Sequence, residues 1–258
     1  MTTFSEHLRR AFGEAKGLAR DFRRLILPPL CPVCQKKLAL HEEHLCSDCF
    51  EQLPFTHFRG KSNNPTERIF LGLTPLEKGH SYIYYYPGSA SSQLIKAFKY
   101  HRRDETAVFL GRLMGEDLEG SHFFDGIDAI VPVPLARKRL HERGYNQSER
   151  LARGLAQATG IEVWDDVLIR HRETPSQTRF TYLQRRENVK DAFRCPCPDR
   201  VSGKHLLLID DVVTTGATLL ACCESMKEIP GIRFSVITLA LTGSADNMFP
   251  SSLHSFGI

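Results

Sequence analysis

The residues with the clearest chemical meaning lie in one segment, HLLLIDDVVTTGATL, at positions 205–219. Four apolar residues at 206–209 lead directly into two adjacent carboxylates, a pattern that predicts a buried parallel strand ending in acidic side chains. Open α/β sheets bind ligands at this end of a strand, and the turn that follows can offer backbone N–H groups to an anion at a helix N-terminus. Because carboxylates beside such a turn suit ribose hydroxyls, directly or through Mg²⁺, the segment predicts a pocket for a phosphorylated sugar. The pocket residues are Asp210, Asp211, Val212, Val213, Thr214, Thr215, Gly216, Ala217 and Thr218.

Other kinds of protein also place paired aspartates after an apolar strand, among them metal-dependent phosphatases and P-loop proteins. The chain contains neither G-x-x-x-x-G-K-[ST] nor G-x-G-x-x-G, which weakens the nucleotide-binding folds as alternatives. The plainest alternative is a buried strand whose aspartates only cap the next helix.

Four of the eight cysteines form the pattern C-x2-C-x11-C-x2-C. In a reducing compartment two such pairs predict a tetrahedral zinc site made of Cys31, Cys34, Cys46 and Cys49. Disulfide bonds are the alternative, and the N-terminal sequence MTTFSEHLRRAF lacks the apolar core of a signal peptide, which argues against them. His41 and His44 lie between the pairs and could replace a cysteine. We expect the other four, Cys195, Cys197, Cys222 and Cys223, to be unligated.

Composition limits the fold and the location. The chain of 258 residues is 41% hydrophobic and 25% charged, which is typical of a globular protein with one α/β domain and a small accessory module. No apolar run approaches the roughly 18 residues of a membrane span, so we expect a cytoplasmic protein. The net charge of +4 is too small to establish a nucleic-acid partner.

Two segments concentrate positive charge near the predicted pocket. The first, IVPVPLARKRLHERGYNQ at 130–147, combines a rigid proline turn with clustered cations that can hold a polyanion such as pyrophosphate. We expect Pro134, Arg137 and Lys138 to take part, and the alternative is an exposed basic helix start. The second, at 170–193, is arginine-rich and polar, so it is either a solvated loop or a flap that closes over an anion.

The order of elements predicts strands alternating with helices and hence a mostly parallel sheet. We expect a helix and zinc module over 1–60, a linker over 61–80, the main domain over 81–242 and a tail over 243–258. Within the main domain we expect strands at 81–86, 127–133, 163–169, 206–209 and 233–241. We expect helices at 90–99, 105–118 and 146–158, and a further helix that follows the turn at 214–218 and continues to about 228. The helix over 1–27 is expected to pack on the module or on its own core, and a partner-binding or membrane-surface helix is the alternative.

Taken together, these motifs resemble the ComF family, whose members take part in natural transformation. The resemblance rests on ILPPLCPVC, KAFKY, VPVPLARKRLHERGYNQ, Arg172-x-Thr174-x-x-Gln177, RRENVKDAF and the acidic segment. It implies a type I phosphoribosyltransferase-like fold that binds phosphoribosyl pyrophosphate (PRPP), with the acidic pair on the ribose and the turn at 214–218 around the 5-phosphate. The chain departs from the family after Tyr100, where His101-Arg102-Arg103 replaces a small turn and adds positive charge.

Three functions remain open at this point. The resemblance implies a zinc-containing PRPP-binding protein that acts in DNA uptake on single-stranded DNA, beside a helicase of the same pathway. The second is an active phosphoribosyltransferase, in which Mg²⁺ neutralises pyrophosphate, Asp210 and Asp211 hold the ribose, and Arg137 or Lys138 stabilises the leaving group. In the third, PRPP regulates a non-catalytic binding module.

A basic cluster could contact single-stranded DNA, with Tyr100 and Tyr84–Tyr86 stacking on bases. Its members are Lys96, Lys99, His101, Arg102 and Arg103. The alternative is a solvated helix end beside a core strand.

Overall fold

The computed structural model describes residues 28–100, 103–172 and 191–242. The chain divides into two compact units, Met1–Gln52 and Leu53–Ile258, so the boundary falls earlier than the one expected near residue 60. The predicted helix over 1–27, the tail at 243–258, most of the arginine-rich loop, His101 and Arg102 lie outside the described residues.

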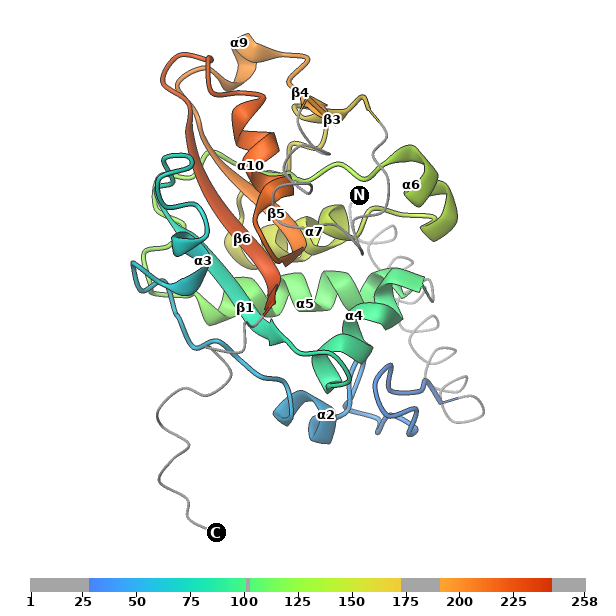
Figure 1. The fold of residues 1–258 in the computed structure, drawn as a ribbon. Helices are drawn as coiled ribbons and strands as arrows, with labels where there is room; N and C mark the ends of the chain where they lie inside the picture. Colours follow the sequence, from blue (N-terminus) through green and yellow to red (C-terminus); the bar gives the residue numbers. More distant parts are fainter. Residues whose placement is uncertain (1–27, 101–102, 173–190, 243–258) are drawn as a thin grey trace, which may run out of the picture. The chain divides into compact units, whose positions relative to one another are not determined.

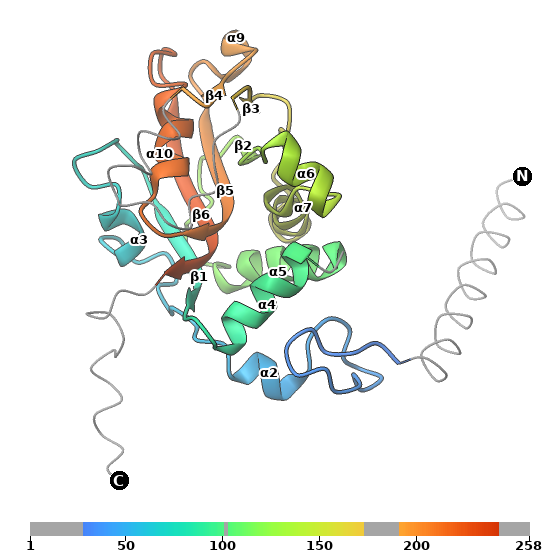
Figure 2. The same cartoon turned by 45° about the vertical axis from the view of Figure 1, so that its right-hand side comes forward.

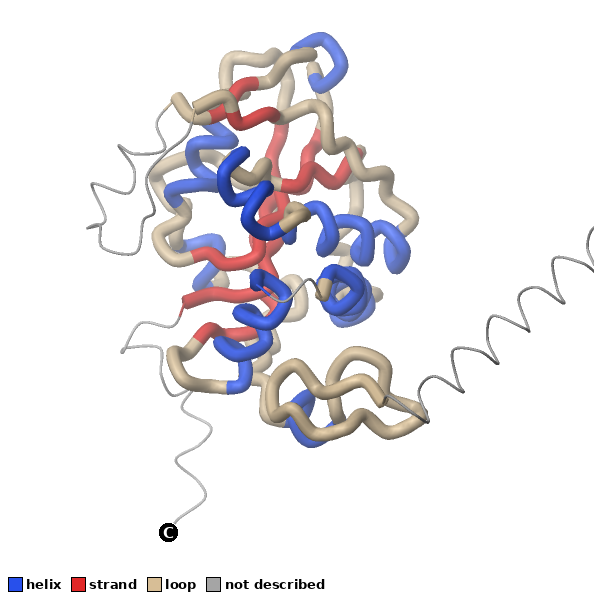
Figure 3. The backbone as a smooth tube through the Cα atoms, turned by 90° about the vertical axis from the view of Figure 1, so that its right-hand side faces the viewer, coloured by secondary structure: helices blue, strands red, loops and turns tan. Residues whose placement is uncertain are grey.

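The described part of the first unit is mostly loop, with one short helix, α2 (Ser47–Glu51) (Figure 3). Hydrogen bonds fix the loops. Leu30 forms a β-bridge with Lys37, and the Glu42 carboxylate accepts from the backbone N–H groups of Ala39 and Ser47. The local fold therefore depends on turns and on polar contacts more than on a large apolar core.

The second unit is built on a four-stranded parallel sheet (Figure 1). Its order is β1-β6-β5-β2, and an isolated parallel bridge between Ile130 and Val163 continues it beyond β2. The strands are β1 (Gly79–Tyr85), β2 (Ala129–Pro132), β5 (His205–Val213) and β6 (Arg233–Thr242). Because the two central strands are buried over most of their length, they have the continuous apolar sequences typical of parallel sheets. The predicted α/β class with a mostly parallel sheet is confirmed.

Helices cover both faces of the sheet. Leu206 and Leu208 of β5 share a buried cluster with Leu219 and Cys222 of α10, and alternation along a strand directs the residues between them to the opposite face. On that face α7 packs against β2 and β5, and α5 lies beside α7 (Figures 1 and 2). The helices of this unit are α3 (Pro65–Arg68), α4 (Ala90–Tyr100), α5 (Asp104–Asp117), α6 (Arg137–Arg143), α7 (Gln147–Thr159), α9 (Pro198–Val201) and α10 (Ala217–Glu224).

Most predicted helices agree with the structure to within one or two residues. The helix after the acidic segment is shorter than expected and ends at Glu224. None of the helices in the described residues is long and apolar enough to cross a bilayer.

The strand predicted at 163–169 is wrong over most of its length. Val163 pairs with the sheet by one bridge, and Ile169 belongs to a separate antiparallel pair of short strands, β3 (Ile169–Arg170) and β4 (Phe193–Arg194). Between them Asp166 is exposed and accepts two 2.8 Å hydrogen bonds from Arg200. A solvated ion pair therefore interrupts the segment where a strand would need to be paired.

The linker predicted over 61–80 is instead folded. Asn64 caps α3 and donates from Nδ2 to the carbonyl of Gly79 at 2.7 Å, while Phe70 is 1% exposed in the core. The Glu67 carboxylate accepts from the Gly79 N–H at 3.0 Å. The Pro, Gly and Asn residues of the segment 61–80 suggested a linker, but in the structure they form turns. The side chains of Asn64 and Glu67 satisfy the backbone groups of Gly79.

Candidate functional site

Asp210 and Asp211 lie where β5 leaves the buried core. The first five residues of the strand are buried and the next three are half-buried. Ser148, near the start of α7, donates from Oγ to Asp210 Oδ1 at 2.9 Å, and the Asp211 N–H donates to the same oxygen at 2.8 Å. The acidic pair therefore lies at the carboxyl end of a central strand, at the edge that the sequence predicted.

Lys99 brings a positive charge to this pair from the last turn of α4. Its Nζ lies 2.8 Å from Asp211 Oδ2, and the two side chains are 18% and 14% exposed. Lys99 thus contacts the acidic pair, and its role in a basic cluster that contacts single-stranded DNA stays a prediction. Since low exposure strengthens the interaction of opposite charges, Lys99 is a built-in counter-ion of the acidic pair.

The electrostatics of the pair follow from its surroundings. Burial, and secondarily the neighbouring Asp211 carboxylate, raise the pKa of Asp210 to about 7. Hydrogen bonds from the Asp211 N–H and Ser148, together with the charge of Lys99, act in the opposite direction and favour the carboxylate. Asp210 therefore binds a proton more readily than an exposed aspartate does.

The turn at 214–218 joins β5 to α10. Gly216 is the N-cap of α10 with φ 70°, a left-handed conformation that glycine adopts without a Cβ penalty. The Leu220 N–H donates to the Gly216 carbonyl at 2.8 Å, and Thr214 Oγ1 lies 3.1 Å from Thr242 Oγ1 at the end of β6. The first N–H groups of α10 and the nearby hydroxyls therefore follow the acidic pair directly, in the order expected for an anion-binding turn.

Two other motifs meet beside the acidic pair. The Tyr145 hydroxyl donates to the carbonyl of Phe98 in α4, and the Arg143 guanidinium lies 5.4 Å from the centre of the Tyr100 ring. Asn146, the N-cap of α7, donates to the carbonyl of Val133 at 3.0 Å. The segments KAFKY and HERGYNQ, far apart in the sequence, thus support each other and the end of β2.

The residues predicted for pyrophosphate follow β2, and the basic ones belong to α6. Pro134 is half-buried after β2, and Arg137 and Lys138 are exposed in the first turn of that helix. The Val133 N–H donates to the carbonyl of Ile209 at 3.0 Å, so Pro134 leaves the sheet at the edge that carries Asp210. A role for these residues toward pyrophosphate stays a prediction.

Lys99 and Ser148 are not among the residues that the sequence predicts for the pocket. The sequence holds only weak signals for them: Lys99 is a cation of KAFKY, and Ser148 lies two residues after Asn146, at the start of a predicted helix. Contacts between α4, α7 and β5 decide both positions, and a single sequence does not specify such contacts.

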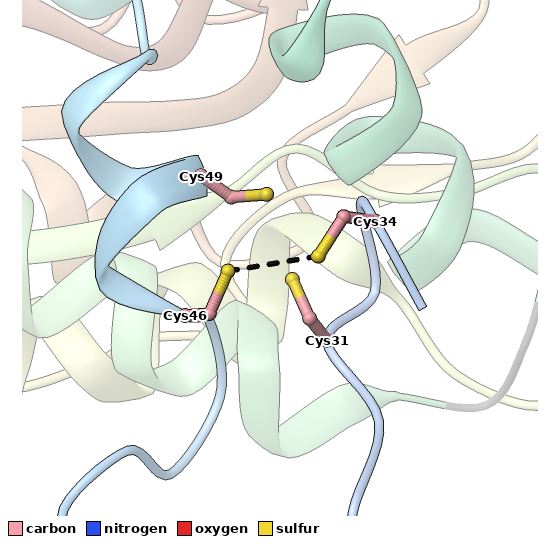
Figure 4. Close-up of side chains that lie close together, drawn as sticks. All are labelled: Cys31, Cys34, Cys46 and Cys49. Atoms are coloured by element: carbon pink, nitrogen blue, oxygen red, sulfur yellow. Dashed lines mark hydrogen bonds between the residues drawn. The ribbon is translucent and has the colours of Figure 1, made fainter. Parts of the chain in front are cut away.

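The first unit brings four cysteines together. The Sγ atoms of Cys31, Cys34, Cys46 and Cys49 all lie within 4.8 Å of one another (Figure 4), and Cys34 Sγ is 3.6 Å from Cys46 Sγ. Zinc–sulfur bonds of about 2.3 Å in a tetrahedron require sulfur atoms about 3.8 Å apart. The cluster therefore has the ligand type and the approximate spacing of a four-coordinate metal site. Among the described residues this metal-ligand group includes neither His41 nor His44.

The remaining cysteines lie in the second unit. Cys222 and Cys223 are buried in α10, and Cys195 and Cys197 are half-buried around Pro196. That they bind no metal stays a prediction.

The fold and site define a class of protein: a parallel α/β domain with an acidic pair at the end of a central strand, preceded by a four-cysteine unit. No family model matches the chain. The chain is 34% identical over 211 residues to DNA utilization protein YhgH of Escherichia coli (strain K12), covering 76% of this chain and 89% of that protein. It therefore belongs to the ComF family of competence and DNA utilization proteins.

Two further relatives carry competence names. Competence protein F of Haemophilus influenzae is 28% identical over 207 residues, covering 78% of this chain and 80% of the relative. Competence protein ComFC of Bacillus subtilis is 28% identical over 200 residues, covering 77% and 72%.

Phosphoribosyltransferases are found among the similar solved structures. Glutamine phosphoribosylpyrophosphate amidotransferase from B. subtilis, complexed with ADP and GMP, matches with a TM-score of 0.36 and 18% identity, covering 55% of this chain and 30% of that chain. Adenine phosphoribosyltransferase from Leishmania donovani matches with a TM-score of 0.34 and 12% identity, covering 64% and 82%.

Proposed function

We propose that this protein binds PRPP at the carboxyl end of β5 and acts in the uptake or utilization of DNA. The observation that carries the proposal is the half-buried pair Asp210 and Asp211, braced by Ser148 and Lys99 and followed directly by the glycine-capped start of α10. A phosphorylated sugar has hydroxyls that suit the acidic pair and a phosphate that suits the turn, and these two features follow each other directly at the end of the apolar strand.

In this proposal each part of the ligand meets a different part of the site. The ribose hydroxyls donate to carboxylate oxygens of Asp210 and Asp211, and the 5-phosphate accepts from N–H groups at the start of α10. Arg137 and Lys138 of α6 bind the pyrophosphate by charge. Bound Mg²⁺ supplies further neutralisation of the pyrophosphate.

Calorimetric titration with PRPP and Mg²⁺ tests the proposal. We expect binding to the wild type and at least about tenfold weaker binding to Asp211→Asn, because a charge-assisted hydrogen bond contributes about 1.5–3 kcal/mol. Asp165→Asn, an exposed aspartate in the same unit, is the matched control and should bind like the wild type. No binding to the wild type, or equal affinity in Asp211→Asn, would refute the proposal.

The names of the relatives bring DNA into the proposal. The Tyr100 side chain is 66% exposed at the end of α4, with Arg143 against its ring and the exposed Lys96 one turn earlier. An exposed aromatic ring among cations suits the bases and phosphates of single-stranded DNA. Because stacking contributes about 1–3 kcal/mol per base, Tyr100→Ala should weaken binding of a labelled oligothymidylate about fivefold or more.

Two variants and a salt series make the DNA measurement specific. Tyr100→Phe keeps the ring and should retain affinity, and Leu71→Ala removes another side chain that is 80% exposed and should change nothing. Affinity should fall steeply as salt rises, because phosphate contacts release counterions. Undetectable binding at low salt would exclude this part of the proposal.

Binding of PRPP does not establish its consumption. Pyrophosphate release in the presence of PRPP, Mg²⁺ and candidate acceptors distinguishes an active phosphoribosyltransferase from a module that PRPP regulates. In the second case PRPP changes DNA affinity and is recovered intact.

A further inference from the structure

Lys99 lies inside the acidic site, and none of the contacts assigned to PRPP above uses it. Lys96 and Lys99 are three residues apart on α4, yet Lys96 is exposed and Lys99 is 18% exposed beside Asp211. The last turn of α4 is held by Phe98, which is 0% exposed and accepts a hydrogen bond from Tyr145. This anchored turn directs Lys99 toward the acidic pair.

The hydrogen bonds around the pair leave a specific set of polar atoms for a ligand. Ser148 Oγ and the Asp211 N–H both bind Asp210 Oδ1, and Lys99 binds Asp211 Oδ2. Each carboxylate therefore has a second oxygen outside these bonds. The ammonium of Lys99 carries three N–H donors, of which Asp211 accepts one.

This set of atoms complements a vicinal diol. A sugar hydroxyl is at once a donor and an acceptor, so two neighbouring hydroxyls can donate to the two carboxylates and accept from the ammonium beside them. A carboxylate pair without a cation would supply acceptors only. Lys99 adds the donor that makes the site complementary to both functions of a hydroxyl.

We propose that Lys99 is a specificity residue that recognises the vicinal diol of a 5-phosphorylated ribose by donating a hydrogen bond to it. The inference rests on the proposed function and adds to it the selection of ribose over 2-deoxyribose. When one hydroxyl is missing, a buried donor or acceptor of the site loses its partner, and this penalty is a strong source of discrimination.

A purely structural ion pair would behave differently. If Lys99 only held Asp211 in position, and Asp211 bound the 3-hydroxyl that both sugars share, the loss of Lys99 would weaken the binding of both sugars by the same factor. If Lys99 donates to the diol, its loss weakens the ribose compound selectively. The ratio of the two affinities therefore separates the two roles.

The experiment is calorimetric titration of the full chain with ribose 5-phosphate and with 2-deoxyribose 5-phosphate, without Mg²⁺. We expect the wild type to prefer ribose 5-phosphate at least about tenfold. Lys99→Met should lose most of this preference, with affinity for the deoxy sugar within about twofold of the wild type. Lys99→Arg keeps N–H donors and should restore part of the preference, and Lys96→Met is the matched control that should keep all of it.

The outcomes separate this inference from the proposed function. An unchanged affinity ratio in Lys99→Met, or equal binding of both sugars by the wild type, overturns the role of Lys99 while leaving PRPP binding intact. A wild type that binds neither sugar phosphate nor PRPP with Mg²⁺ overturns both. Lys99→Gln is a second neutral variant should Lys99→Met fail to fold.

Discussion

The ring of Phe70 lies against Gly216 so closely that no side chain fits between them. A Cβ atom on Gly216 would be 3.0 Å from Cε1 of Phe70 and 2.6 Å from Cγ2 of Ile69. The turn predicted to bind phosphate is therefore supported by the segment that the sequence suggested was a linker.

Gly216→Ala should destabilise the protein and weaken PRPP binding together. The left-handed φ of 70° costs an alanine about 1 kcal/mol, and displacing Phe70 adds about 1–3 kcal/mol. Urea unfolding measures the sum. Gly120→Ala is the control, because Gly120 has φ 73° but open space around its Cβ position, so it should lose only about 1 kcal/mol. Equal losses in both variants would contradict the role of Phe70.

The acidic segment and the cysteine spacing could be interpreted from the sequence because their meaning is local. An apolar run predicts a buried strand, and a residue after that run must lie at the sheet edge. The positions of Phe70 and Lys99 could not be predicted in this way. Both depend on contacts between elements distant in the sequence, and the turn-rich composition around Phe70 resembles that of an unstructured linker.

The buried His80 makes stability depend on pH. Its side chain is 0% exposed, between the rings of Phe58 and Phe123, and neither ring nitrogen has a hydrogen-bond partner among the described residues. Burial lowers the pKa of His80 to about 4 from its ordinary value of 6.5. As pH falls from 6.5 toward 4, His80 binds a proton in the unfolded chain but stays neutral in the folded chain. The free energy of unfolding therefore falls.

At pH 4 the free energy of unfolding is lower by about 3 kcal/mol because of His80. His80→Phe removes the titrating group and should show a correspondingly smaller decrease between pH 6.5 and 4 in urea unfolding. His122 is the control, because its imidazole is 85% exposed. The stability of His122→Gln should change with pH as that of the wild type does. Parallel pH curves for wild type and His80→Phe would show that His80 does not contribute.

The close crossing of α5 and α7 depends on glycines and affects the site through Ser148. A Cβ on Gly154 would collide with the backbone carbonyl of Val108 and lie 2.8 Å from the Arg112 N. Gly154→Ala should therefore cost about 2 kcal/mol in urea unfolding, the overpacking penalty less the gain in helix propensity. It should also weaken PRPP binding, because α7 carries Ser148 to Asp210.

The neighbouring exposed residue Gln157 gives the control for this helix. Gln157→Ala changes no buried contact and should stay within about 0.5 kcal/mol of the wild type. A Gly154→Ala variant as stable as this control would mean that the helices separate without cost.

We expect zinc to stabilise the fold of the first unit, whereas the second unit has its own apolar core and should fold without zinc. Apart from the cysteines, the buried apolar residues in the described part of the first unit are Leu38 and Leu45. A unit with so small a core usually depends on its metal to fold. Elemental analysis should therefore find one zinc ion per chain in the wild type and little in Cys46→Ser, while Cys195→Ser keeps the full content.

Loss of zinc should then affect the two units unequally. In Cys46→Ser, or after chelation of the wild type, we expect limited proteolysis to cut within residues 28–52 and to leave a resistant fragment that begins near Leu53. The main urea transition should persist, because the sheet and its helices belong to the second unit. Proteolysis that degrades both units at the same rate would show that they fold as one, and full zinc content in Cys46→Ser would place the metal elsewhere.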